Sequence, residues 1–186
     1  NTPGVLFNAM LAPLIPGAFK GCIWYQGEHN AGPGKGVLYQ PLLRNMIIGW
    51  RKAFMDDMPF GVVQLPNFNP VAKVPVQSRG WGGSWIDVRE SQAAVARMMD
   101  GVGCICTIDL GDARNIHPAR KLEVGQRLAG WALNQVYGKK GEFSGPVYDS
   151  LKVEGDSIRL YFKHLGGGLI SKDKAKLRWF AIAGDD

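Results

Sequence analysis

Two short polar segments of this 186-residue chain contain side-chain types that hydrolytic enzymes use. The stronger one, residues 109–118, places Asp109, Asp112 and His117 within nine residues. An imidazole can take a proton from a hydroxyl nucleophile, and a carboxylate can hold that imidazole in the right tautomer. The segment therefore predicts a general base with an acidic partner. The plainer interpretation is a loop in which Asp109 caps a turn and Asp112 pairs with Arg114.

The other segment, residues 24–31, is rich in polar groups that follow an apolar run. It contains Gln26, Glu28, His29 and Asn30. An amide side chain just beyond a strand can donate a hydrogen bond to a developing oxyanion. The competing interpretation is a polar turn held by its own side-chain hydrogen bonds.

Both segments follow apolar runs that predict buried parallel strands. Amphipathic stretches between and after these runs predict helices, one of them with Leu38, Leu42, Ile47 and Trp50 on its apolar face. The predicted strands are residues 21–25, 60–65 and 102–108, and the predicted helices are 5–12, 38–54, 86–99 and a last one that opens near Pro118. Strand and helix thus alternate, which predicts an α/β fold with a parallel sheet flanked by helices. Ligands of such sheets bind beyond the carboxyl ends of the strands, where both polar segments lie.

The pattern changes after residue 141. Residues 1–141 are expected to form the α/β domain and residues 142–186 a small β appendage, with strands at 147–153, 158–162 and 179–183. A β-unit of this size is marginally stable by itself.

Composition argues against several classes of function. The net charge of +6 comes from dispersed lysines and arginines, so we expect no nucleic-acid partner. The sequence contains no apolar run of about 18 residues, so we expect no membrane span. The three cysteines lack histidines at ligand spacing, so we expect neither a metal nor another cofactor. The sequence sets no oligomeric state.

Several stretches, in one consistent order, resemble the sialate O-acetylesterase family. They are Asn8-Ala9-Met10 with Ala12-Pro13-Leu14, Lys20-Gly21 with Trp24-Tyr25-Gln26-Gly27-Glu28 and Asn30-Ala31, Trp85 with Arg89-Glu90 and Gln92, and Ile108-Asp109-Leu110-Gly111-Asp112 with Ile116-His117-Pro118, Lys121, Val124-Gly125 and Arg127-Leu128-Ala129. Each stretch is unspecific alone, but the ordered set is specific and covers nearly the whole chain.

The resemblance implies a carbohydrate esterase with an SGNH or flavodoxin-like α/β fold and an acetylated carbohydrate as substrate. In such an enzyme His117 would be the general base. Asp112, which is nearer along the chain than Asp109, would be its acidic partner. Gln26 would supply an oxyanion-hole amide, and Glu28 and Asn8 would line or brace the site. The resemblance also implies a secreted or periplasmic location.

Two departures from the family pattern bear on activity. His29 stands where the family commonly has serine, so it is either a substrate contact or a tolerated substitution. The Gly-Gln-Ser-Asn segment that carries the family's nucleophile is absent, so we expect a partial chain. Gly155-Asp156-Ser157 matches the Gly-Asp-Ser motif of many SGNH esterases, but its place between two predicted strands indicates an ordinary turn.

Two other functions remain open on the sequence. One is a non-catalytic glycan-binding remnant of this family. The other is a glycoside hydrolase that pairs Glu28 with Asp109 or Asp112 as acid and base.

Overall fold

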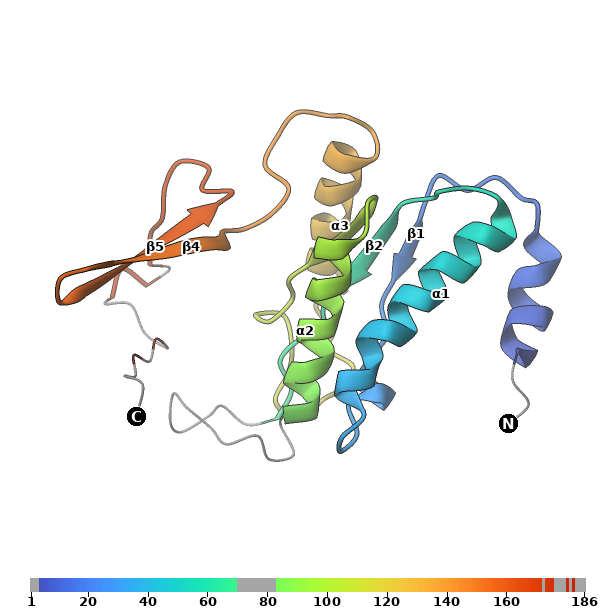
Figure 1. The fold of residues 1–186 in the computed structure, drawn as a ribbon, viewed down its shortest axis with the longest axis horizontal. Coiled ribbons are helices and arrows are strands. Elements are labelled where there is room, and N and C mark those ends of the chain that lie inside the picture. The colour runs from blue at the N-terminus through green and yellow to red at the C-terminus, as the bar shows by residue number, and fades with distance from the viewer. Residues whose placement is uncertain (1–3, 70–82, 172, 176–179, 181, 183–186) are drawn as a thin grey trace. The chain divides into compact units, whose positions relative to one another are not determined.

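The computed structural model describes residues 4–69, 83–171, 173–175, 180 and 182 (Figure 1). The chain divides into two compact units. The first unit contains Asn1–Leu65 and Trp81–Ile108, and the second contains Pro66–Gly80 and Asp109–Asp186. The domain boundary that the sequence predicts after residue 141 stays a prediction.

A three-stranded parallel sheet forms the centre of the first unit. Its strands are β1 (Cys22–Trp24), β2 (Phe60–Val63) and β3 (Val102–Ile105), in the order β1-β2-β3. Helix α1 (Tyr39–Phe54) connects β1 to β2, and α2 (Gly83–Met98) precedes β3. Right-handed crossovers that step in one direction across a sheet put successive helices on the same face. Figure 1 shows α1 and α2 side by side in front of the sheet. The predicted α/β fold is confirmed.

The main core lies between these two helices and the sheet. Phe60 and Val62 of β2 are fully buried and pack with Ile47 of α1 and Val88 and Val95 of α2. Alternate residues of a strand share a face, so Phe60 and Val62 point to the same side. This packing sets the carboxyl ends of β1 and β2 at one edge of the unit.

The buried face of α1 differs from the predicted one in its first turns, whereas the predicted Ile47 is fully buried and Trp50 is half-buried. Leu38 and Leu42 are 57% and 55% exposed, whereas Tyr39 and Leu43 are each 3% exposed. Positions four apart share a helix face, so the buried series begins one residue later than predicted and includes a tyrosine.

Among the described residues, no helix is both long and apolar enough to cross a bilayer.

Short helical turns complete the first unit. The helix predicted at residues 5–12 appears as a π-helical turn, η1 (Phe7–Leu11), followed by a 3-10 turn, η2 (Ala12–Leu14). Two more 3-10 turns, η3 (Glu28–Asn30) and η4 (Gly36–Leu38), lie between β1 and α1.

The second unit contains α3 (Lys121–Gln135) and an antiparallel hairpin of β4 (Val147–Glu154) and β5 (Ser157–Lys163). The helix begins at Lys121 rather than at Pro118. The hairpin confirms the strands predicted at 147–153 and 158–162. Most of the run at 179–183 lies outside the described residues.

Candidate functional site

Gln26 follows β1 at the carboxyl edge of the sheet, and hydrogen bonds hold both ends of its side chain. Its Oε1 accepts a hydrogen bond from the Tyr39 hydroxyl at 3.0 Å. Its Nε2 donates to Oδ1 of Asn30 at 2.9 Å. An amide nitrogen carries two N–H groups, so one remains for a ligand. The predicted oxyanion donor is therefore held in one orientation.

Gln92 of α2 holds the ends of β1 and β2 together, although it is fully buried. Its Oε1 accepts from the backbone N–H of Leu65 at 2.9 Å. Its Nε2 donates to the carbonyl of Gln26 at 3.0 Å and to that of Val63 at 3.3 Å. Buried polar groups are costly unless they are paired, and this amide pairs three backbone groups at once.

The next residue, Gly27, must lack a side chain. Its φ of 152° is one that residues with a Cβ rarely adopt. A Cβ there would lie 2.9 Å from Cγ1 of Val88 and 3.2 Å from Nε2 of Gln92. The turn after Gln26 can therefore approach α2 only because residue 27 is glycine.

Arg89 reinforces the same edge of the sheet. Its Nε donates to the carbonyl of Leu65 at 2.9 Å, while Nε2 of Gln64 donates to the Arg89 carbonyl at 3.3 Å. Burial lowers the pKa of the Arg89 guanidinium. Arg89, in the stretch of α2 that resembles the esterase family, thus holds the backbone at the carboxyl end of β2.

Sequence reasoning missed two residues of this site, Tyr39 and Gln92. Gln92 stood in a recognised stretch, but its partners are 27 to 66 residues away. Tyr39 lay one position off the predicted apolar face of α1. A predicted apolar face that began at Tyr39 instead of Leu38 would have included it.

The other candidates of the first unit surround this turn less tightly. Glu28 is half-buried in η3, and His29 beside it is exposed. Asn8 is an exposed residue of η1. Within the described ranges, the Asn8 side chain makes no hydrogen bond to Gln26 or Glu28. A cavity of about 220 Å³ lies beside Gln26, lined also by Trp24, Tyr39 and residues of α1.

The loop before α3, in the second unit, is shaped by Asp112. Its Oδ1 accepts the backbone N–H groups of Arg114 at 2.7 Å and Asn115 at 3.2 Å. Oδ1 of Asn115 in turn accepts the N–H of His117 at 2.9 Å. Short polar side chains commonly form such turns with the residues that follow them. One carboxylate oxygen of Asp112 is thus committed to the loop.

Asp109 makes a two-pronged ion pair with Arg127 of α3. Both oxygen-to-nitrogen distances are 2.7 Å. The hydrogen bonds from Arg127 hold the pKa of the Asp109 carboxyl below its usual value, and the nearby charges of Arg127 and Arg120 add to this. Asp109 therefore anchors the loop to α3.

A contact between Gly111 and Asn67 ties this loop to the segment that follows β2. The Gly111 N–H donates to Oδ1 of Asn67 at 2.8 Å. A Cβ on Gly111 would collide with the Asn67 backbone. Asn67 and Gly111 both belong to the second unit.

His117 is exposed at the end of this loop. In the part of the chain that the structure describes, its ring makes no hydrogen bond or ion pair with Asp109 or Asp112. Gln26, Glu28 and His29 belong to the first unit, and Asp109, Asp112 and His117 to the second. The roles that the sequence assigns to these residues stay predictions.

The serines near the recognised stretches are not presented as nucleophiles. Ser84 and Ser91 are buried in α2, and the Ser91 hydroxyl donates to the Gly36 carbonyl at 3.3 Å. Ser157 lies at the hairpin turn, where its hydroxyl donates to Asp156 at 3.1 Å. The turn interpretation of Gly155-Asp156-Ser157 agrees with this geometry.

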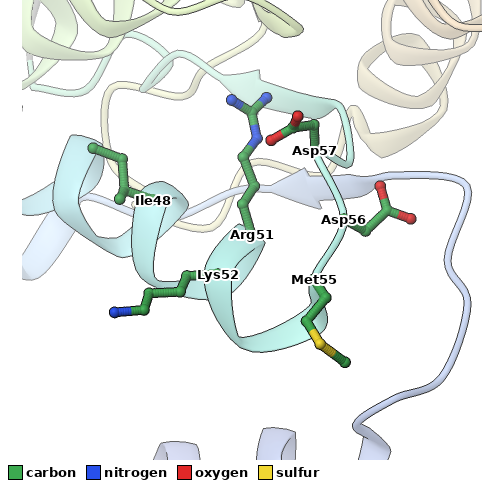
Figure 2. Close-up of a pocket in the computed structure, with 6 residues that line it drawn as sticks. All are labelled: Ile48, Arg51, Lys52, Met55, Asp56 and Asp57. Carbon is green, nitrogen blue, oxygen red and sulfur yellow. The ribbon is translucent and has the colours of Figure 1, made fainter.

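A larger pocket of about 440 Å³ lies elsewhere, around the end of α1 and the loop into β2 (Figure 2). This loop enters the amino end of β2, so it is at the opposite edge of the sheet from Gln26. Arg51 in its wall donates to the carbonyls of Met58 at 3.1 Å and Asp100 at 2.9 Å. The arginine thus anchors two loops, and the pocket is not part of the candidate site.

No group of three or more His, Cys, Asp or Glu side chains within the described ranges could hold a metal ion.

Comparison with known proteins identifies similar chains. No family model matches. The chain is 32% identical over 168 residues to the sialate O-acetylesterase of Rattus norvegicus, over 82% of this chain and 30% of that protein. The human sialate O-acetylesterase is 29% identical over 162 residues, which are 80% of this chain and 30% of that protein. A crystal structure of a carbohydrate acetylesterase from Xanthomonas citri superposes with a TM-score of 0.75 at 36% identity, covering 88% of this chain and 36% of that one. The chain thus spans about a third of the length of these proteins.

Proposed function

Because this chain is a homologue of the sialate O-acetylesterases, we propose that it is part of a carboxylic ester hydrolase that removes O-acetyl groups from glycans. The observation that carries the proposal is the oriented amide of Gln26 at the carboxyl edge of a parallel sheet. A tetrahedral intermediate of acyl transfer needs such a fixed donor for its oxyanion.

The mechanism we propose is acyl transfer through a serine. His117 takes the serine proton as the oxygen bonds to the acetyl carbon, then returns it to the sugar oxygen as the ester bond breaks. Water, deprotonated by His117, then attacks the acetyl carbon of the acetyl-enzyme; His117 returns the proton to the serine oxygen as its bond to the acetyl carbon breaks, and acetate leaves. Gln26 donates its second N–H to the oxyanion in both steps.

Asp112 is our choice for the acidic partner of His117. Arg127 occupies both carboxylate oxygens of Asp109. Asp112 uses one oxygen to shape the loop and keeps the other for an imidazole. We expect Asp112→Asn to lower kcat strongly, because the amide favours the wrong histidine tautomer. An equal loss in Asp109→Asn would count against this choice.

The remaining candidates are assigned to substrate contact. We assign Glu28, in η3 close to Gln26, to binding sugar hydroxyls, and Asn8 to bracing the site. His29 is exposed, so its assignment to substrate contact has the least support of the three. We expect His29→Ser, which restores the family's residue, to change KM more than kcat.

Histidine substitution tests the proposal directly. The assay follows acetate release from a chromogenic acetyl ester and from O-acetylated sialic acid, using the protein as its gene encodes it. His117→Ala should lower kcat/KM by about 1,000-fold or more. His164→Ala is the matched control, because His164 lies after β5 and pairs with Glu142. Full activity in His117→Ala would refute the assigned base.

The nucleophile is identified by covalent labelling. A serine-directed phosphonate should label one serine, which peptide mass spectrometry then locates. The chain spans 30% of the rat enzyme, and the sample to label is the full product of the gene. Glycan binding with neither turnover nor labelling would replace the esterase by a binding function. Turnover of a glycoside without acetate release would favour the carboxylate pair of a glycosidase.

Sialic acid is one of several acetylated glycans that such a site could serve, and the same assay separates it from acetylated xylan. We also propose a secreted or periplasmic location, on the strength of the family resemblance. Fractionation of the source cells tests it, and activity confined to the cytosolic fraction would contradict it.

A further inference from the structure

Tyr39 is a buried phenol at the first position of α1, and its hydroxyl lies at the centre of the Gln26 network. The side chain is 3% exposed. Its oxygen accepts a hydrogen bond from Nε1 of Trp24 at 3.1 Å. Its O–H is shared between the carbonyl of Gln26 at 2.8 Å and Oε1 of the same residue at 3.0 Å.

These contacts determine which end of the Gln26 amide faces the phenol. A phenol oxygen has one proton to give and two lone pairs to accept with. Trp24 donates to that oxygen, and its single O–H is directed at the carbonyl and Oε1 of Gln26. Oδ1 of Asn30 can only accept, so it pairs with Nε2 of Gln26 and not with Oε1. The phenol therefore favours Oε1 of Gln26, and Nε2 turns toward Asn30.

The hydroxyl stays protonated under ordinary conditions. Burial raises the pKa of the Tyr39 phenol, and the charge of Glu28 adds to the rise, although the hydrogen bond from Trp24 opposes it. Tyr39 thus remains a hydrogen-bond donor throughout the neutral pH range.

We propose that Tyr39 is a positioning residue that fixes the Gln26 side-chain amide with an N–H directed toward the reacting oxygen. The inference rests on the proposed esterase function, because it gives Gln26 its oxyanion role. Tyr39 itself touches no substrate in this scheme. It acts by excluding the flipped and rotated orientations of the amide.

Tyr39→Phe isolates this role from simple folding. The Gln26 carbonyl keeps a donor in that variant, because Nε2 of Gln92 lies 3.0 Å away. Oε1 of Gln26 instead loses the Tyr39 hydroxyl that holds it. The ring remains in place to fill the core. Tyr161→Phe is the matched control, since Tyr161 lies on β5 with 42% of its surface exposed.

The first measurement needs no turnover. The side-chain NH₂ signals of Gln26 are followed in ¹H–¹⁵N spectra and assigned by their loss in Gln26→Glu. In Tyr39→Phe we expect both protons to shift and to exchange with water about three- to tenfold faster, as loss of one hydrogen bond implies. Tyr161→Phe should leave them unchanged. Unchanged Gln26 signals in folded Tyr39→Phe would overturn the proposal, whether or not the protein is an esterase.

The second measurement is kinetic. Tyr39→Phe should lower kcat for an acetyl ester about three- to tenfold while KM changes less than about twofold. Because both residues act through one amide, Tyr39→Phe should have almost no further effect in a Gln26→Ala background. Additive losses, or a loss confined to KM, would overturn the positioning role. Absence of turnover in the unaltered protein would refute the esterase function alone, and the spectra would still decide the role of Tyr39.

Discussion

Gln92→Leu offers the sharpest test of how the candidate site is held. Leucine has a similar volume and no polar atoms, so the change removes hydrogen bonds without opening a large cavity. The buried N–H of Leu65 would lose its partner at 2.9 Å, and the carbonyl of Val63 its donor at 3.3 Å. The Gln26 carbonyl would keep the Tyr39 hydroxyl.

The expected cost follows from these groups. An orphaned buried N–H costs about 1–3 kcal/mol, and a weaker lost hydrogen bond about 0.5–1.5 kcal/mol. The free energy of unfolding should therefore fall by about 2–4 kcal/mol, a large share of the ~5–15 kcal/mol typical of domains. With a urea m-value of about 1.5 kcal/mol/M, the unfolding midpoint should drop by about 1.5–2.5 M.

Urea unfolding followed by circular dichroism measures this change. Gln126→Leu is the matched control, because Gln126 is exposed on α3 and the substitution is the same. The control should alter the free energy of unfolding by less than about 0.5 kcal/mol. If Gln92→Leu cost no more than the control, the three hydrogen bonds of Gln92 could not be what holds the strand ends.

Three further outcomes follow from the site. Gly27→Ala should destabilise by about 1–3 kcal/mol through its clash with α2, whereas Gly125→Ala, which meets open space, should not; equal melting temperatures would contradict this. Because the folded pKa of Asp109 lies below its unfolded value, its pair with Arg127 stabilises above about pH 4 and is lost as the pH falls through the folded pKa. Arg127→Met should therefore lower stability near pH 7 by at most about 1 kcal/mol, since the pair is solvent-exposed, and by less near pH 2; a loss of equal size at both values would be inconsistent. The Cys104 thiol should resist iodoacetamide at about pH 8, because burial raises its pKa to about 12; rapid alkylation in the folded protein would refute this.

The sequence by itself determined the order and kind of the main elements. Apolar runs marked the strands at residues 22–24, 60–63 and 102–105, although only β2 is buried along its whole length and Ile23 of β1 is 68% exposed. Alternation with helices implied a parallel sheet, and that placed Gln26 at a carboxyl edge. The hairpin turn was equally local, since Gly155 with a φ of 65° needs only its neighbours.

The sequence could not decide which polar side chains hold that edge, because their partners are distant in the chain. Gln92 reaches a carbonyl 66 residues away, and Asp109 pairs with an arginine 18 residues on. Hydrophobic periodicity indicates which face of a helix is buried, but it does not count a buried amide or phenol as part of that face. The predicted apolar face of α1 therefore omits Tyr39, although its hydroxyl lies between Trp24 and Gln26. Only the packing of α1 and α2 against the sheet gave these side chains their partners, because hydrogen bonds depend on positions that the tertiary fold alone sets.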